Sequence, residues 1–219
     1  MSFFGALMEK PWENGGLADP SPVDRPKTPP MRVALRFFLV VVGILFFMMV
    51  VAYAGRLSYE DWRPVPSSGL MWLNTAILVA ASIAMQVSVW AARANNWRRS
   101  KLALEIGGLL TVAFLFAQVW AWRQLVGIEM FEIHNPAIAL FLIITGAHGL
   151  HMLGGLWVWL RTTNKIWRSN DFDTAKVRQS IELSTTYWHF LLAVWLVLFG
   201  LLFVNNDNLD ILLTICGLK

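Results

Sequence analysis

Five long apolar runs, separated by short polar segments, dominate the pattern of this 219-residue chain. A helix needs about 20 mostly apolar residues to cross the hydrocarbon core of a membrane. The runs meet this length and predict spans at about residues 33–54, 70–92, 102–122, 136–160 and 183–204. A membrane β-barrel would instead show short segments of alternating polarity. The pattern therefore predicts an all-α integral membrane protein, a bundle of five transmembrane helices.

The segments outside these runs are short. Residues 1–32 hold six of the nine prolines, a composition typical of an extended tail. Residues 205–219 form a second tail at the C-terminus. We therefore expect one transmembrane domain, residues 33–204, between two tails, and no separate globular domain.

The positions of the basic residues predict the orientation of the chain. Of the 18 Lys and Arg residues, 14 lie in the N-terminal tail and in the second and fourth loops. Cytoplasmic loops carry an excess of these residues, so we expect a cytoplasmic N-terminus and a periplasmic C-terminus. The formal charge of +4 does not indicate a nucleic-acid partner, because the basic residues lie between spans and not on one soluble face.

Composition supports the membrane prediction and narrows the chemistry. Hydrophobic residues make up 57% of the chain, charged residues 15%, and the mean hydropathy is +0.54. A soluble domain carries about 25% charged residues. Cys216 is the only cysteine, so the chain alone cannot form a disulfide, a zinc ribbon or an iron–sulfur cluster.

Polar side chains within the predicted spans are the candidate functional residues, because they are costly in lipid. In the second span, Thr75, Ser82 and Gln86 share one helical face. Small residues surround them, which favours a helix-packing seam. Several tryptophans, such as Trp159 and Trp188, lie near span ends, where indole rings prefer the headgroup layer.

Histidines form the sharpest feature of the spans. His148 and His151 lie one turn apart in the fourth span, and His189 lies in the fifth. Such a pair suits either axial ligation of a haem or metal or a hydrogen-bonded structural pair. Two haems would need four histidines in two pairs, which leaves one bis-histidine haem as an open alternative. We predict no catalytic residue and no metal site in this chain.

Three stretches resemble subunit III of the haem–copper respiratory oxidases, in the five-helix bacterial form of that cytochrome c oxidase family. The resemblance runs from about Arg36 to Val204. Its motifs are Leu73-Asn74-Thr75, then Thr145-Gly146-Ala147-His148-Gly149-Leu150-His151, and then Glu182 followed by Tyr187-Trp188-His189-Phe190 and Val194-Trp195-Leu196, with Gln118 at the end of the third span.

The resemblance implies a non-catalytic subunit of a bacterial terminal oxidase, which reduces oxygen to water and pumps protons. Such a subunit stabilises the catalytic subunit I and holds phospholipids in a cleft between helices. It binds no cofactor itself, because haem and copper belong to the partner subunits. Its location would be the bacterial inner membrane, as a multi-pass protein among other oxidase subunits, and within a larger respiratory supercomplex.

The same resemblance assigns roles to individual residues. The polar side chains of the motifs would form a structural seam between helices: Asn74, Gln118, His148, His151, Glu182, Tyr187 and His189. Basic residues on the cytoplasmic side are the candidates for binding lipid headgroups by charge-assisted hydrogen bonds: Arg36, Arg161, Lys165 and Arg168.

The chain also departs from the family. Three carboxylates common in the family are replaced at Gly43, Ala121 and Leu192, so a role in proton uptake that needs them is not carried over. Three alternatives stay open. They are an accessory subunit of a nitric oxide reductase, subunit III of a quinol oxidase, and a haem b membrane anchor in which His148 and His189 face each other.

Overall fold

A computed structural model describes residues 30–56, 69–129, 136–168 and 174–201 of the chain. These residues form five helices: α2 (Pro30–Arg56), α3 (Gly69–Arg93), α4 (Trp97–Glu129), α5 (Pro136–Arg168) and α6 (Thr174–Leu201). Each of the five is long and apolar enough to cross a membrane. The predicted class, an all-α membrane protein with five transmembrane helices, is confirmed.

The helices extend beyond the predicted spans. α4 begins at Trp97 and α6 at Thr174, well before the apolar runs at residues 102 and 183. The apolar count identifies only the part of a helix within the hydrocarbon, whereas backbone hydrogen bonds continue into the polar interface. The predicted tails lie outside the described residues, apart from residues 30–32, which form the start of α2.

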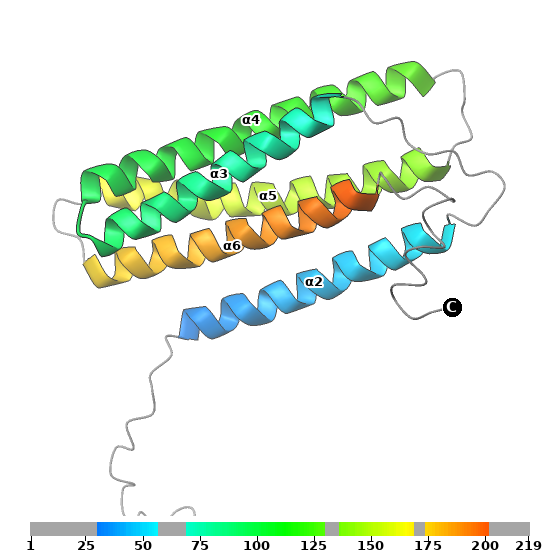
Figure 1. Cartoon of the computed structure of the whole chain (residues 1–219). Helices are drawn as coiled ribbons and strands as arrows, with labels where there is room; N and C mark the ends of the chain where they lie inside the picture. Colours follow the sequence, from blue (N-terminus) through cyan, green and yellow to red (C-terminus); the bar gives the residue numbers. More distant parts are fainter. Residues whose placement is uncertain (1–29, 57–68, 130–135, 169–173, 202–219) are drawn as a thin grey trace, which may run out of the picture. The chain divides into compact units, whose positions relative to one another are not determined.

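The chain divides into two units, residues 1–35 and residues 36–219. Only residues 30–35 of the first unit are described. In the second unit, α3 packs on α4 and α6, and α5 packs on the same two helices, which closes a four-helix bundle (Figure 1).

A short hairpin joins α3 to α4. Asn95 turns the chain with a φ of 58°, in the left-handed region that asparagine tolerates well. The side chain of Asn96 then accepts a hydrogen bond from the backbone N–H of Arg99 at 3.2 Å and caps α4. Just beyond the turn, the hydroxyl of Ser88 donates to the carbonyl of Ser100 at 2.9 Å. The hairpin therefore holds α3 and α4 at close range.

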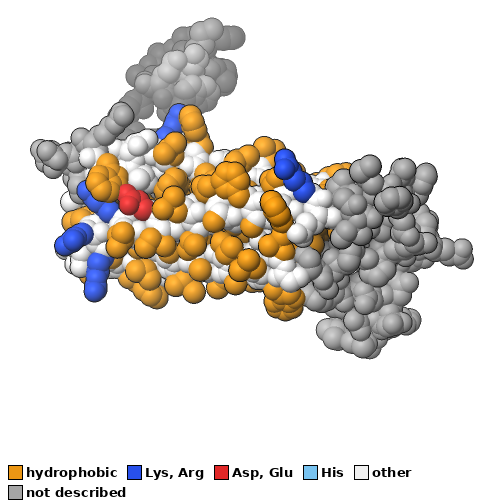
Figure 2. All heavy atoms as spheres, turned by 90° about the horizontal axis from the view of Figure 1, so that it is seen from above, with side chains coloured by type: hydrophobic (Ala, Val, Ile, Leu, Met, Phe, Trp, Pro, Cys, Tyr) orange, Lys and Arg blue, Asp and Glu red, His pale blue; other side chains and the backbone are white. Residues whose placement is uncertain are grey.

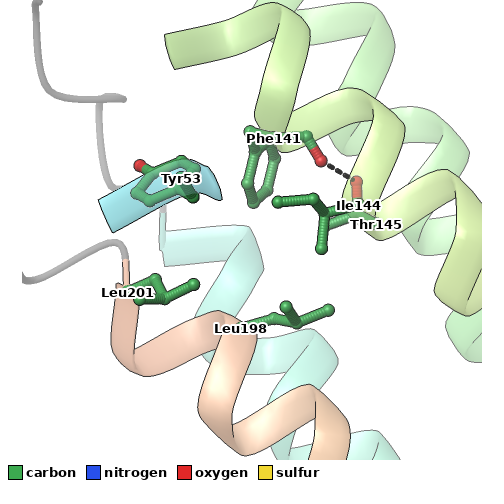
Figure 3. A pocket seen from close by; sticks show the side chains of 6 residues that line it. All are labelled: Tyr53, Phe141, Ile144, Thr145, Leu198 and Leu201. Atoms are coloured by element: carbon green, nitrogen blue, oxygen red, sulfur yellow. Dashed lines mark hydrogen bonds between the residues drawn. The ribbon is translucent and has the colours of Figure 1, made fainter. Parts of the chain in front are cut away.

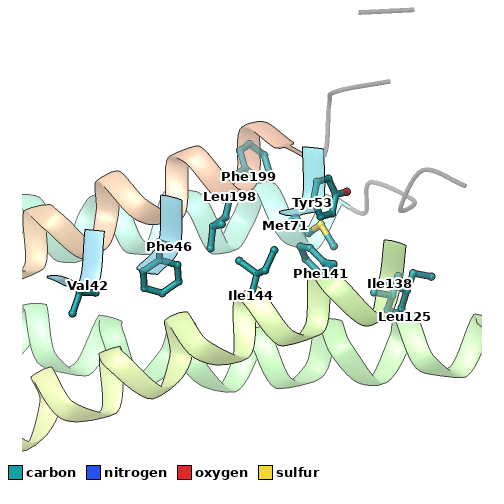
Figure 4. Packing of buried hydrophobic residues seen from close by; sticks show 10 residues of the cluster. All are labelled: Val42, Phe46, Tyr53, Met71, Leu125, Ile138, Phe141, Ile144, Leu198 and Phe199. Carbon is teal, nitrogen blue, oxygen red and sulfur yellow. The ribbon is translucent and has the colours of Figure 1, made fainter. Parts of the chain in front are cut away.

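One cluster of buried hydrophobic side chains joins residues of α2 to the bundle (Figure 4). Val42, Phe46 and Tyr53 of α2 are each at most 5% exposed. They pack with Ile144 of α5 and Leu198 of α6 within the cluster. These side chains attach α2 to the bundle.

The outer surface of the helices is largely apolar. Large side chains such as Phe37, Phe116 and Leu150 are about 70% exposed, at 71%, 74% and 69%. Figure 2 shows one such face, covered mainly by hydrophobic side chains, with Lys and Arg gathered mostly toward one end. Such an apolar surface suits a lipid environment. Helices can lie there because their backbone N–H and C=O groups bond to each other within the helix.

Candidate functional site

The predicted polar seam links four helices through side-chain hydrogen bonds. Between α3 and α4, the amide Nδ2 of Asn74 donates to Oε1 of Gln118 at 2.8 Å. Both side chains are buried, at 0% and 4% exposure. Within the described residues, Oδ1 of Asn74 and Nε2 of Gln118 make no further hydrogen bond. The pair therefore joins two helices at one point without completing its hydrogen-bonding capacity.

The polar face of α3 meets α6. The indole N–H of Trp195 donates to the hydroxyl of Thr75 at 3.0 Å. The two ring nitrogens of His189 bond to Ser82 Oγ at 2.6 Å and to Gln86 Oε1 at 2.9 Å. Thus Thr75, Ser82 and Gln86, which the sequence places on one face, all bond to side chains of α6.

Three further tryptophans bind neighbouring helices through their indole N–H groups. The bonds run from Trp188 to the hydroxyl of Thr111 at 2.8 Å, from Trp159 to the carbonyl of Leu104 at 2.9 Å and from Trp122 to the hydroxyl of Thr145 at 3.2 Å. The headgroup position expected for Trp188 is wrong, since the side chain is 1% exposed. An indole can only donate, so burial between helices requires an acceptor such as Thr111.

His148 lies in the interior of the bundle and is 1% exposed. Its ring stands 5.6 Å from the Trp195 ring and 6.4 Å from the Phe114 ring, centroid to centroid. Phe46 of α2 approaches it edge-on at 6.2 Å. Neither ring nitrogen makes a hydrogen bond within the described residues. The ring of His148 therefore acts in packing between aromatic side chains of three other helices.

His151 is bonded to its own helix. Its Nδ1–H donates to the carbonyl of Ala147 at 2.8 Å, and its own carbonyl accepts the hydroxyl of Tyr187 at 2.7 Å. Phe46 lies 5.3 Å from its ring. The Tyr187 bond joins α5 to α6, and the Phe46 contact joins α5 to α2.

The side chains of His189 and His148 have different neighbours in the structure. The imidazole of His189 faces α3, where both of its nitrogens are bonded. His148 is enclosed by Phe46, Phe114 and Trp195. The two rings therefore do not face each other, as the haem b anchor requires. Within the described ranges, His, Cys, Asp and Glu form no group of three that could hold a metal ion.

Glu182 lies at the end of α6 where basic residues gather. Its Oε1 accepts hydrogen bonds from Nε of Arg93 at 3.0 Å and from Nη2 at 2.9 Å. Beside it, Arg178 donates to Oδ1 of Asn95 in the α3–α4 hairpin at 2.9 Å. Glu182 thus belongs to a polar link between α6 and α3, at the helix ends and apart from the intramembrane seam.

The candidate headgroup residues lie on two helices. Arg36 is exposed on α2. The guanidinium of Arg161 stacks over the Trp157 ring, 4.9 Å from its centroid, on α5. Lys165 and Arg168 belong to the last turns of α5, and their side chains lie outside the described part of the structure. The structure therefore places two of the four predicted side chains.

An open apolar groove of about 240 Å³ lies between α2 and α6. Its walls are Gly43, Phe46, Phe47 and Val50 of α2 and Ala193, Val194, Val197 and Leu198 of α6. At Gly43, an added Cβ would lie 3.7 Å from Phe190, an ordinary contact distance. The absent side chain therefore leaves room at one wall of the groove.

A smaller apolar cavity of about 10 Å³ lies near the end of α2 (Figure 3). Tyr53 of α2, Phe141 and Thr145 of α5, and Leu201 of α6 are among its walls. The hydroxyl of Thr145 points back to its own helix, where it donates to the carbonyl of Phe141 at 2.7 Å. This cavity has room for about one water-sized group, so the groove offers the larger binding space.

Fold and seam together define a class: a multi-pass helical membrane protein whose intramembrane polar side chains join helix to helix. The family model of cytochrome c oxidase subunit III matches residues 31–206. The chain belongs to this family.

Two relatives of this chain are also named as cytochrome c oxidase subunit 3. Cytochrome c oxidase subunit 3 of Thermostichus vulcanus is 28% identical over 184 residues, covering 80% of this chain and 88% of the relative. A probable cytochrome c oxidase subunit 3 of Nocardia farcinica is 33% identical over 165 residues, covering 73% and 78%. As a family member, the chain is part of a respiratory oxidase complex and associates with other oxidase subunits in a membrane.

Proposed function

We propose that the chain is the non-catalytic subunit III of a bacterial haem–copper terminal oxidase in the inner membrane. The complex would reduce oxygen to water with electrons from cytochrome c and pump protons. This chain would stabilise the catalytic subunit and hold phospholipid between its helices. The match of the family model over residues 31–206 carries the proposal, and the named bacterial relatives favour the bacterial form.

The hydrogen bonds and packing contacts of the histidines agree with a supporting, non-catalytic role. Both ring nitrogens of His189 and Nδ1 of His151 make hydrogen bonds within the chain, and His148 is enclosed by aromatic rings. These bonds and contacts join α3, α4, α5 and α6. Haem and copper would therefore belong to the partner subunits.

Lipid retention is favoured by the groove between α2 and α6. All eight side chains or backbone positions along it are apolar, which suits an acyl chain. Arg36 lies seven residues before Gly43 on α2, or about 10 Å at the helical rise. A phospholipid could bind Arg36 through its phosphate, by a charge-assisted hydrogen bond, and run its acyl chain along the groove.

Purification of the assembled oxidase tests the subunit assignment. The chain should copurify with haem- and copper-containing subunits, and denaturing separation should leave no haem on it. The complex should oxidise reduced cytochrome c in preference to a quinol. Recovery of one haem per chain from the isolated subunit would contradict the proposal, as would copurification with a nitric oxide reductase.

Groove-filling substitutions test the lipid assignment. We expect Gly43→Phe to lower the phospholipid retained per complex, because the new ring enters the groove. Gly55→Phe, on the same helix, is the matched control, since a Cβ there meets nothing within 4 Å and Gly55 does not line the groove. Native mass spectrometry of the complex measures the retained lipid. Equal lipid content in the two variants would contradict this assignment.

A further inference from the structure

The outward face of α6 presents polar side chains at mid-span. His189 lies near the middle of the 28-residue α6 and is exposed. Comparable exposed positions on other helices carry apolar side chains, for example Ile83 at 58%, Phe116 at 74% and Leu150 at 69%. A polar side chain that is partly exposed to hydrocarbon is costly, so this face is unlike the rest of the described surface.

The hydrogen bonds of His189 determine which polar group on this face has no partner within the described residues. Nε2 of His189 meets Oε1 of Gln86 at 2.9 Å and donates its proton there, and Nδ1 then accepts the hydroxyl proton of Ser82 at 2.6 Å. The amide Nε2 of Gln86 makes no hydrogen bond within the described residues, and its side chain is partly exposed. This face therefore presents an N–H donor toward the surroundings.

The shape of the same face suits a second helix. Exposed residues follow one another along α6 at spacings of three and four, the period at which two helices interlock: Thr186, His189, Ala193, Leu196 and Gly200. We call these five residues the α6 seam, of which Ala193 also borders the groove between α2 and α6. Two of them are small, and a Cβ added at Gly200 would meet nothing within 4 Å. Small residues allow the close approach on which helix association in lipid depends.

We propose that the α6 seam, together with Gln86 of α3, is the surface on which a transmembrane helix of another oxidase subunit packs. That helix places a hydroxyl, amide or carboxyl oxygen opposite the Gln86 amide. An acyl chain has no such acceptor and would leave the Gln86 amide facing hydrocarbon. The inference rests on the proposed function, because it assumes neighbouring subunits, and adds the face and the chemistry by which they bind.

Photocrosslinking in the assembled oxidase tests the α6 seam. A benzophenone amino acid replaces Leu196, which is 46% exposed on the seam, or Phe116, which is 74% exposed on α4. We expect a crosslink from position 196 to a second subunit and a crosslink from position 116 to lipid. A crosslink from position 196 to lipid alone would overturn the proposal. If the chain fails to copurify with haem- and copper-containing subunits, the proposed function itself fails.

Substitutions at two open glycines supply a test that does not depend on the internal hydrogen bonds. A Cβ meets nothing within 4 Å at either Gly200, on the seam, or Gly154, on α5. We expect Gly200→Phe to lower the amount of chain that copurifies with the oxidase by at least about threefold, while Gly154→Phe leaves it unchanged. Equal recovery of both variants would overturn the proposal.

Gln86 gives the chemical half of the test, because its amide is the donor that the proposal assigns to the partner's oxygen. We expect Gln86→Leu to lower recovery of the chain with the oxidase by about 3- to 30-fold, the range for an intramembrane hydrogen bond. Gln86→Asn keeps an amide and should restore part of the loss. Circular dichroism of each variant confirms that the helices are intact. Full recovery of a folded Gln86→Leu variant would overturn the polar contact of the proposal.

Discussion

The four helices α3–α6 and the helix α2 are attached in different ways. Hydrogen bonds between side chains run across the α3–α6 bundle, as between Trp188 and Thr111. The described contacts of α2 are those of apolar and aromatic side chains such as Phe46. In the most apolar stretch of each helix, 44% of the residues are buried in α3 and α6, but 17% in α2.

This difference teaches how helices associate where water is absent. Lipid tails are as apolar as leucine, so burial of apolar surface gives little drive for association, and packing and hydrogen bonds must supply it. The bundle has both, through buried polar side chains and through glycines that let aromatic rings approach. The described contacts of α2 with the bundle are packing contacts on one narrow face, and a groove lies beside them.

The largest effect should come from the aromatic centre of the bundle. Trp195→Ala removes a 2% exposed side chain that contacts His148, Phe114 and Thr75. We expect a loss of about 3–5 kcal/mol in the free energy of unfolding in detergent, the cost of a large buried cavity. Trp120→Ala is the control, at 61% exposure, and should change it by about 0.5 kcal/mol or less. Similar losses for both would contradict a packed bundle.

Two adjacent glycines should separate close packing from helix propensity. A Cβ at Gly155 would lie 2.5 Å from the Tyr187 ring, whereas at Gly154 it meets nothing within 4 Å. We expect Gly155→Ala to destabilise the bundle by about 1–3 kcal/mol through overpacking. Gly154→Ala should stabilise it by up to about 1 kcal/mol, because alanine favours helix. Thermal unfolding in micelles measures both, and a stabilised Gly155→Ala variant would contradict the contact.

A substitution on α2 should affect that helix alone. Phe46→Ala removes two edge-on aromatic contacts, to His148 and His151, which are worth about 1–3 kcal/mol together. We expect faster amide hydrogen exchange in α2 and unchanged exchange in α4. Phe37→Ala, at 71% exposure, is the control and should alter neither. Equal acceleration in both helices would show that α2 and the bundle unfold as one unit, and would contradict the separate attachment of α2.

A double-mutant cycle should measure one hydrogen bond of the seam. Asn74→Leu leaves the buried amide of Gln118 without its partner, at a cost of about 1–2 kcal/mol. Asn74→Leu combined with Gln118→Met removes both polar groups, so the double variant should recover most of that loss. Unfolding midpoints of the four proteins give the coupling energy, expected near 0.6–2 kcal/mol. Additive losses would mean that the two amides do not interact.

The smallest effect should come from the helix ends. Arg93→Gln removes the ion pair with Glu182, in which the Arg93 side chain is 59% exposed. Exposed ion pairs contribute about 0–1 kcal/mol and are screened by salt. We expect a small loss of stability at low ionic strength that disappears in about 1 M salt. A larger, salt-independent loss would make this pair part of the structural seam.

Local pattern predicted much of this molecule. The five helices could be read from run length, because each must satisfy its own backbone in lipid and therefore needs a full apolar span. The shared face of Thr75, Ser82 and Gln86 followed from the helical period alone, and it is the face that meets α6.

The burial and the partners of other residues could not be predicted from the neighbouring sequence. Trp188 looks like a headgroup anchor by its place in the span, yet it is buried against Thr111. Spacing along one helix cannot reveal which residue of another helix accepts its proton. His148 and His189 looked equivalent as intramembrane histidines, but one is enclosed by aromatic rings and the other is exposed beside α3.

The amino-acid sequence by itself determined the five helices of the described residues, the membrane as their solvent and the family to which the chain belongs. These follow from apolar run length and short motifs, which are properties of neighbouring residues. Only the tertiary structure decided that His148 packs between aromatic rings, that the exposed His189 bonds to α3, and that Gly43 borders a groove. Such properties depend on which faces of distant helices meet, and in lipid those faces are chosen by packing and hydrogen bonds between helices rather than by apolarity.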